Sequence, residues 1–408
     1  MATENTETPG SAEASALATQ FRVSADALDE GVRNGTADKA LGDARAALSK
    51  RLVTPADTGA SLRKKLEGAA FTLDSANFTE APRARDWILM RPATSDDRTG
   101  GGKLAVREGT SDPVVGVFPA GKVGFLAAAG GAGKTAALVR LALAVATGRD
   151  WFDGQWYPPV AGRVLLALGE EDAEEISRRV YYTADQMKLT SHERAVAIKS
   201  ILALPLAGIP LPFIQQGPDR NPVEAEGLGV VRDILDKHAG DGWRLLIFDP
   251  LSRFASSDAE KDNAQATRLV QAFETLAEVK GGPGVIIAHH TSQGSRSNES
   301  DASTNAVRGV TALTDGARWV TQLSPKTNRA PSPKPEGWKP TWTRTEFALL
   351  KSNYGPPAEP FYLVNERGVL CAENEDQRAA REATRDGAPS GQASTSPPGS
   401  THPRGRPV

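Results

Sequence analysis

This sequence has almost no cysteine, and long apolar runs and an excess of charge of either sign are missing. Its 408 residues include one cysteine, Cys371, which excludes an intramolecular disulfide and fits a reducing compartment. No apolar run approaches the ~20 residues of a membrane span. The first 20 residues are polar and show neither the basic start nor the apolar stretch of a signal peptide. We therefore expect a cytoplasmic protein with no membrane partner.

The charges are almost balanced. The chain has 48 lysines and arginines against 50 aspartates and glutamates, a net charge of −2. No general basic field indicates nucleic acid, so any contact with DNA must come from local clusters. With 39% hydrophobic residues, the chain can bury one sizeable core and leave a smaller domain or tails.

The most informative stretch is 123–135. An apolar run that indicates a buried strand leads into small residues, and Lys134 and Thr135 then open a helix rich in alanine and leucine. This order is typical of a phosphate-binding loop, whose backbone N–H groups wrap an anion only where no side chain intrudes. The positive end of the helix faces the phosphates. The expected nucleotide contacts are Ala128, Ala129, Gly130, Gly131, Ala132, Gly133, Lys134, Thr135 and Ala136.

Side-chain chemistry assigns roles within this loop. Lys134 can reach the β- and γ-phosphates of ATP, and the Thr135 hydroxyl can hold Mg²⁺. The pattern begins with Ala128 where glycine is usual, and a glycine-rich turn between a strand and a helix is the simpler alternative. The strand before the loop and the helix after it favour the nucleotide site.

A second nucleotide signal ends the apolar run 245–248. Asp249 places a carboxylate at the carboxyl edge of a buried strand, where it can orient Mg²⁺ and complete the site of Lys134 and Thr135. Many strands end in aspartate before a turn, and Pro250 suits such a turn, so the pattern becomes specific only beside a phosphate loop. The sequence therefore predicts Thr135 and Asp249 as the metal site, with ATP and Mg²⁺ as cofactors.

No glutamate follows Asp249, so the base that ATP hydrolysis needs must come from elsewhere. Glu170 and Glu171 follow the predicted strand 163–168, and we favour Glu171 over Glu170 as the catalytic carboxylate. The alternative is an acidic first turn of a helix, which the helix dipole stabilises.

Two of the five histidines, His289 and His290, stand together at the end of the predicted strand 284–288. Neighbouring strand residues face opposite sides of a sheet, so only one of them can point at the nucleotide. A neutral imidazole there can hydrogen-bond the γ-phosphate. A packed or capping histidine is the alternative, and a zinc site is disfavoured because no cysteine lies nearby.

Strands and helices alternate through the middle of the chain. Predicted strands lie at 163–168, 200–204, 244–248 and 284–288, with helices at 223–238 and 263–280. This alternation predicts an α/β fold with a mostly parallel sheet covered on both faces. Short strands at 317–323, 345–350 and 360–364 predict antiparallel additions at one edge of that sheet.

The composition divides the chain into five parts. We expect a disordered N-terminus, a small helical region, a linker, the main domain and a disordered C-terminal tail. Within the main domain, the serine-, asparagine- and glycine-rich segment 291–306 reads as a loop that leaves a strand end. The five parts are 1–20, 21–85, 86–113, 114–371 and 372–408.

Three basic residues near the end of the main domain are further candidates. Arg308 or Arg318 could reach into a neighbouring subunit's site as an arginine finger, although a surface arginine is the usual case. Lys351 ends a predicted strand before a turn that contains glycine, and we group it with the nucleotide contacts.

Six motifs occur together in this order, and the set resembles the plasmid RepA-type replicative helicases, within the RecA/DnaB/KaiC class of ATPases. The resemblance covers roughly residues 115–371. It implies a RecA-like P-loop core and a ring, usually a hexamer, with ATP held between subunits. The motifs are 130–135, 171–172, 246–254, 289–294, 308–319 and 351–355.

The same resemblance implies a role for each matching residue. Glu171 would activate water, His290 would sense the γ-phosphate, and Arg308 is the favoured finger over Arg318. Lys134, Thr135 and Asp249 keep the roles given above. The loop 292–306 would face DNA in a central channel, so single-stranded DNA and replication proteins are the implied partners.

Three functions are compatible with these motifs. The first is an ATP-driven helicase or translocase on single-stranded DNA. The second is an ATP-dependent recombinase or loader that coats DNA without unwinding it. The third is a nucleotide-gated binding protein with slow turnover, which the acidic residues Glu299 and Asp301 in the loop support because they weaken its attraction to phosphates.

Overall fold

The computed structural model divides the chain into two compact units, residues 1–84 and 85–408, and every element described below belongs to the second. The predicted disordered N-terminus, most of the predicted helical region and the loop 291–306 lie outside the described residues. In the part of the chain that is described, no helix is long and apolar enough to cross a membrane. The described residues are 63–64, 66–70, 72–73, 79–80, 83–99, 104–217, 219, 221–256, 262–290, 311–327 and 343–386.

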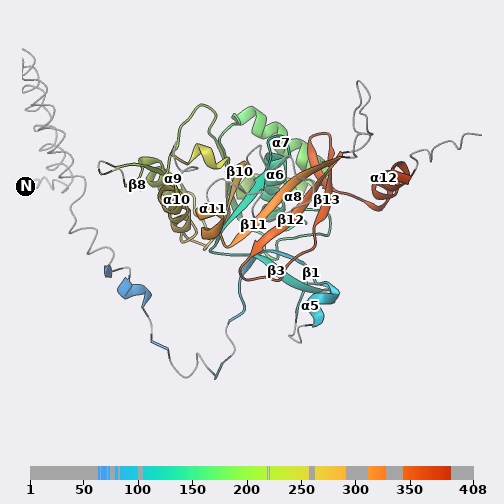
Figure 1. Ribbon diagram of the computed structural model, residues 1–408, viewed down its shortest axis with the longest axis horizontal. Coiled ribbons are helices and arrows are strands. Elements are labelled where there is room, and N and C mark those ends of the chain that lie inside the picture. The colour runs from blue at the N-terminus through green and yellow to red at the C-terminus, as the bar shows by residue number, and fades with distance from the viewer. Residues whose placement is uncertain are drawn as a thin grey trace, which may run out of the picture. The chain divides into compact units, whose positions relative to one another are not determined.

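A nine-stranded sheet forms the centre of this unit, in the order β14-β13-β12-β11-β4-β10-β9-β5-β6 (Figure 1). The six strands from β11 to β6 run parallel, and β12, β13 and β14 extend the sheet in antiparallel fashion. The predicted α/β fold with antiparallel strands at one edge is confirmed. The strands are β4 (Val123–Ala128), β5 (Arg163–Leu168), β6 (Ile201–Pro205), β9 (Trp243–Asp249), β10 (Gly284–His290), β11 (Trp319–Thr327), β12 (Thr343–Ser352), β13 (Phe361–Glu366) and β14 (Val369–Ala372).

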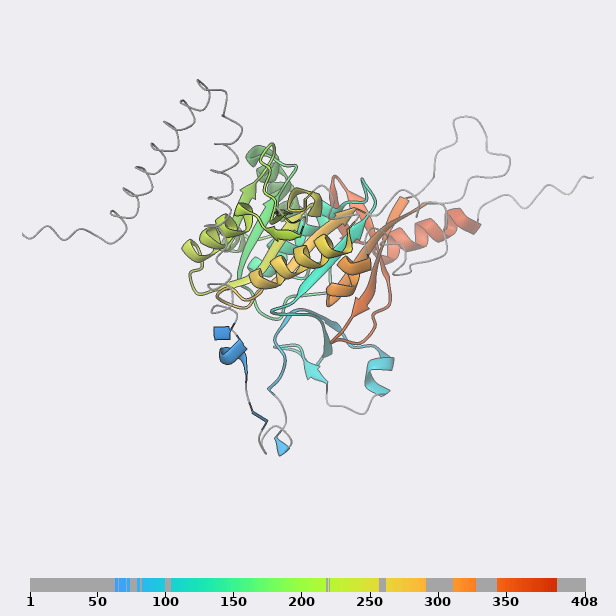
Figure 2. The same ribbon diagram turned by 60° about the vertical axis from the view of Figure 1, so that its left-hand side comes forward.

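Helices cover both faces of the sheet, as the helix α10 in front of the strands in Figure 2 illustrates. Residues of β4 alternate between two cores: Leu126 packs with α6, and Phe125 packs in the cluster of α9 and α10. Burial on both faces explains why the parallel strands are nearly continuous apolar runs. One face carries α6 (Lys134–Thr147), α7 (Ala173–Gln186) and α8 (Ser191–Ser200), and the other carries α9 (Glu226–Lys237), α10 (Asn263–Leu276) and α11 (Thr311–Gly316).

Residues 86–113 are not the linker that we predicted. They contain β1 (Trp87–Pro92), α5 (Ser95–Thr99) and β2 (Ala105–Val106), and both strands pair antiparallel with β3 (Pro113–Pro119). The prediction failed because these pairings join separate segments, and the short strands lack a local repeat.

A buried ion pair anchors this small sheet. Arg91 contacts Asp97 at 2.7 Å, and their side chains are only 6% and 5% exposed. The hydrogen bond from Arg91 lowers the pKa of Asp97 to about 2. Arg91 also donates to the carbonyl of Pro357, which ties the small sheet to the segment after β12.

The predicted disordered tail begins instead with a helix, α12 (Glu375–Asp386). Two of its polar side chains contact residues that precede the helix: Arg381 contacts Glu373 at 3.0 Å, and the Gln377 amide donates to Glu366 at 2.8 Å. The polar residues that indicated disorder at the start of the tail therefore form a helix, which polar side-chain contacts hold in place. Such contacts require no apolar residues, so the sequence shows no apolar pattern there.

Candidate active site

The phosphate loop leaves β4 at the carboxyl edge of the parallel strands and ends where α6 begins. Gly131 and Gly133 have φ values of 77° and 93°, which favour glycine. A Cβ atom added at Gly131 would meet nothing within 4 Å, whereas one at Gly133 would lie 2.7 Å from Leu370. The loop is therefore open toward the cleft and packed against β14 behind, a cradle in which the N-terminus of α6 can receive an anion.

Thr135 and Asp249 meet in this cleft because α6 starts, and β9 ends, at the same edge of the sheet. The Thr135 hydroxyl donates to the Asp249 carboxylate at 2.6 Å. Two adjacent ligands of an octahedral Mg²⁺ at ~2.1 Å would lie ~3 Å apart, so the two oxygens need to separate only slightly to share the metal. Burial raises the pKa of Asp249, and the Thr135 hydroxyl and the charge of Lys134 partly oppose the shift. This pair fits the predicted metal site.

Lys134 is 6% exposed and lies in the same cleft. Burial lowers the pKa of Lys134, opposed by the charges of Asp249 and Glu170. Its ammonium nitrogen is 3.0 Å from Nδ1 of His290. Among the described residues no carboxylate comes within ion-pair distance of this ammonium group, which leaves a buried cation suited to an anionic ligand.

The two histidines separate as the strand period requires. His290 lines the cleft on the α6 face, level with Ala128 across the sheet. His289 is 4% exposed on the opposite face, and burial lowers its pKa to about 4. His290 is thus the histidine that the fold directs to the nucleotide.

The two candidate glutamates occupy different places. Glu170 lines the cleft, whose volume is about 330 Å³, together with Lys134 and Asp249. Glu171 does not line it, and its carboxylate contacts Arg179 at 2.9 Å. Burial raises the pKa of Glu171, and Arg179 opposes the shift. Both carboxylates stand at the end of β5, where Leu168 is level with Asp249.

Three residues of the cleft were not predicted from the sequence. Arg179 of α7 lines it beside Glu170. Asn365 and Gly368 line it from the turn between β13 and β14, where the Gly368 N–H donates to the Asn365 side chain at 2.8 Å. The Asn-Glu-Arg-Gly sequence indicates a turn, but nothing local indicates that this turn, more than 200 residues from the phosphate loop, reaches the nucleotide.

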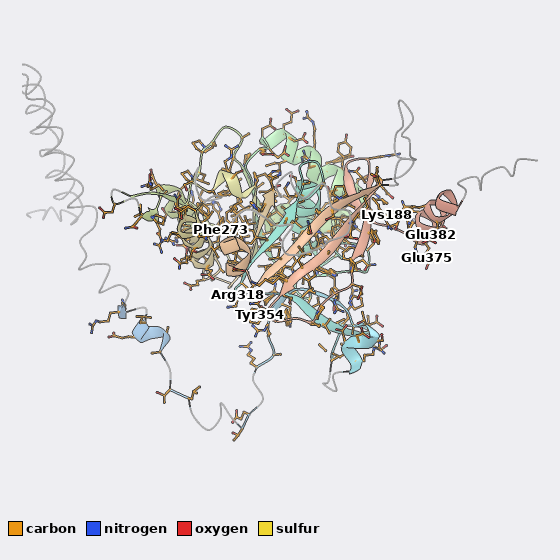
Figure 3. The ribbon with its side chains drawn as sticks, viewed as in Figure 1. Lys188, Phe273, Arg318, Tyr354, Glu375 and Glu382 are labelled. Atoms are coloured by element: carbon orange, nitrogen blue, oxygen red, sulfur yellow. The ribbon has the colours of Figure 1, made fainter. Side chains whose placement is uncertain are left out.

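Lys351 and Arg318 lie at the opposite end of the parallel strands, so Lys351 does not contact the nucleotide of its own subunit. Lys351 pairs with Val320 in the sheet, and Arg318 precedes β11 (Figure 3). Trp319 is level with Gly124, four residues or ~13 Å before the strand end that carries the cleft. Arg318 therefore does not reach the cleft of its own chain, and Arg308 lies outside the described residues.

A comparison with protein families agrees with this site. Residues 95–296 match the family model described as AAA domain, and the match includes the phosphate loop, Asp249 and His290. The chain is also similar to a solved structure described as an ATPase domain, at 16% sequence identity over 62% of this chain and 85% of that chain, with a TM-score of 0.41. The family match and the geometry of the cleft together support an ATPase whose phosphate loop lies within residues 95–296.

Proposed function

We propose that this protein is a ring-forming motor that hydrolyses ATP with Mg²⁺ and moves on single-stranded DNA, as its resemblance to the plasmid RepA-type helicases implies. The observation that carries the ATPase chemistry is the 2.6 Å contact between Thr135 and Asp249 beside the buried Lys134. Support for a DNA motor comes from the order of the sequence motifs.

Within the cleft each side chain has a distinct task. The loop N–H groups and Lys134 hold the β- and γ-phosphates, and His290 lies beside Lys134 where it can hydrogen-bond the γ-phosphate. Thr135 and Asp249 hold Mg²⁺, which neutralises charge on the phosphate oxygens when bound. A water molecule attacks the γ-phosphorus, the bond to the bridging oxygen breaks, and a carboxylate takes the proton of the water.

We propose Glu171 as this carboxylate because burial raises its pKa toward the range of a general base. Arg179 lines the cleft and holds Glu171, so ligand binding near Arg179 can release the base. Glu171→Gln should lower turnover about a hundredfold or more while ATP still binds. Glu170→Gln tests the competing residue, and Glu174→Gln, which changes an exposed glutamate of α7, is the matched control. A Glu170→Gln enzyme that alone loses turnover would transfer the role to Glu170.

The ring proposal is supported by the shortage of positive charge in the cleft. Arg179 is already paired with Glu171 and Glu175, and Lys134 is then the remaining described cation beside the phosphate loop. We propose that Arg308 of a neighbouring subunit supplies the second one. Mixtures of Arg308→Ala and Lys134→Ala subunits should recover activity, since a Lys134→Ala subunit still carries Arg308 and can complete the intact phosphate loop of an Arg308→Ala neighbour. Intact rings with no recovery in any mixture would contradict this role.

Phosphate release with and without single-stranded DNA tests the whole proposal. A DNA-dependent motor should turn over faster with DNA, and a rate indifferent to DNA would remove the motor function while leaving the ATPase. Electron microscopy separates the helicase from a recombinase or loader, since closed rings favour the first and open filaments the second.

A further inference from the structure

A second cavity, of about 590 Å³, adjoins the nucleotide cleft, and we call it the side cavity. Of the described residues, Glu170 lines both. Asp249 belongs to the cleft, and the next residue, Pro250, belongs to the side cavity. A ligand in the side cavity could therefore contact Glu170, which also lines the nucleotide cleft.

Arg253 gives the side cavity a cation. It ends the short 3-10 helix η1 (Leu251–Arg253), is half-buried, and has no ion pair or side-chain hydrogen bond with any described residue. A guanidinium group offers five N–H donors in a planar fork that fits a phosphate. This fork therefore favours an anionic ligand.

Arg253 is also in close contact with the segment that carries Glu170. A Cβ atom added at Gly169 would lie 2.9 Å from Cβ of Arg253 and 3.0 Å from its Nε atom. The Gly169 N–H donates to the carbonyl of Asp249. A movement of the Arg253 side chain would thus act directly on Gly169, which is hydrogen-bonded to Asp249 and precedes Glu170.

The rest of the side cavity is suited to a nucleobase. Gln265 is 5% exposed, its amide oxygen accepts a hydrogen bond from Ser256, and its amide nitrogen has no acceptor among the described residues. Apolar side chains and amide groups together fit a base, whose ring face can contact the apolar side chains and whose polar edge can hydrogen-bond the amides. The apolar wall consists of Pro210, Pro212, Ile214, Pro250 and Ala255.

Two buried aromatic residues, Phe213 and Phe254, stand next in the chain to residues that line the side cavity. Phe213 and Phe254 pack at 5.1 Å between ring centroids, within a cluster that includes Phe248 and Phe273. The Phe213 N–H donates to the carbonyl of Phe254 at 2.8 Å, which fixes the hairpin of β7 (Ile214–Gln216) and β8 (Pro222–Glu224) beside η1. The apolar wall that the hairpin contributes is therefore held in place before a ligand arrives.

From this geometry we infer that the side cavity binds one nucleotide unit of single-stranded DNA, with Arg253 on the phosphate, and that Arg253, through its contact with Gly169, positions the strand end that carries Glu170 and Glu171 in response. The inference rests on the proposed function, since it names the DNA contact of the same motor. It makes Arg253 a positioning residue that connects DNA binding to ATP hydrolysis.

The test uses the full-length protein, a labelled oligothymidylate and a non-hydrolysable ATP analogue. Arg253→Gln should weaken DNA binding about tenfold and reduce the slope of log K against log salt by about 1. At a fixed subsaturating DNA concentration, the stimulation of phosphate release should fall by a similar factor. Arg253→Lys keeps the positive charge but loses the planar fork of the guanidinium group. Its DNA affinity and its stimulation by DNA should lie between those of the wild type and Arg253→Gln. Arg268→Gln makes the same change on a partly exposed arginine of α10 outside the cavity and should match the wild type.

Thermal unfolding verifies that each variant is folded. Arg253→Gln with wild-type DNA affinity and stimulation would overturn the inference. An equal loss of turnover with and without DNA would overturn it as well, because Arg253 would then serve hydrolysis itself. A wild-type protein that neither binds DNA nor responds to it is a separate result, which removes the proposed motor function before any variant is compared.

Discussion

The two ends of the parallel strands differ in chemistry although each holds a lysine with a shifted pKa. At the carboxyl end, Lys134 stands beside a hydroxyl and carboxylate pair and the N-terminus of α6. At the amino end, Lys351 donates to the backbone carbonyl of Asp315 at 3.0 Å. Burial lowers the pKa of both lysines. A shifted lysine alone therefore does not identify a phosphate site, and the groups around it decide.

Cations and an aromatic ring gather at the amino end. The Arg85 guanidinium lies 4.2 Å from the ring centroid of Tyr354, and the Lys122 ammonium lies 6.0 Å from it. Tyr354 lies close to Arg318, because the next residue back, Asn353, donates its N–H to the Arg318 carbonyl (Figure 3). The glycines beside these residues, Gly121 and Gly355, stand in turns that lead into strands and not into a helix, so we expect mutations at the two ends to affect different steps.

Lys134→Ala should have the largest effect on ATP turnover and ATP binding. It removes the buried cation that offsets the γ-phosphate charge, so turnover should fall at least about a hundredfold and ATP should bind more weakly. Phosphate release and titration with a fluorescent ATP analogue measure the two quantities. Lys237→Ala, at an exposed lysine of α9, is the control. Turnover close to wild type would show that the carboxyl end is not the ATPase site.

Asp249→Asn should lower turnover about a hundredfold and raise the Mg²⁺ concentration needed for half-maximal rate. It should not reduce stability without nucleotide. Because the folded-state pKa of Asp249 is raised, ionisation of the buried carboxylate lowers the free energy of unfolding as pH rises above 3.8, and asparagine removes that loss.

Magnesium titrations and thermal unfolding at pH 7 measure the two effects of Asp249→Asn. Asp233→Asn, on an exposed residue of α9, is the matched control. Full activity in Asp249→Asn at low Mg²⁺ would exclude Asp249 from the metal site.

His289→Gln should change the pH dependence of folding. The folded-state pKa of about 4 lies below the ordinary histidine value of 6.5, so the unfolded chain binds the proton more tightly and stability falls as pH decreases from about 6.5 to about 4. The loss amounts to about 3 kcal/mol for this residue. Urea unfolding at pH 7 and pH 4.5 should show a smaller difference for His289→Gln than for the wild type. His192→Gln, at an exposed histidine, should keep the full difference.

Lys351→Ala should have the smallest effect on nucleotide binding. Lys351 lies at the amino end, so ATP affinity at the subunit's own cleft should change less than about twofold. The ATP titration used for Lys134→Ala measures it. A loss of affinity comparable with that of Lys134→Ala would contradict the separation of the two ends.

The local sequence was sufficient to predict the strands of the core. The predicted strand 163–168 is β5, and the predicted strand 284–288 is most of β10, because residues buried on both faces are apolar without interruption. The strand period also separated His289 from His290. The phosphate loop was recognisable because a backbone cradle requires small residues in consecutive positions.

The sequence alone therefore determined which residues could bind a phosphate and a metal, since that chemistry depends on residue type and short spacing. Tertiary structure alone decided which distant segments complete the cleft. It brought the turn at Asn365 and Gly368 to the phosphate loop, placed Lys351 at the far end of the strands, and paired the supposed linker with β3. These outcomes depend on strand order and direction, which arise from pairing between segments far apart in the chain and leave no pattern within any one of them.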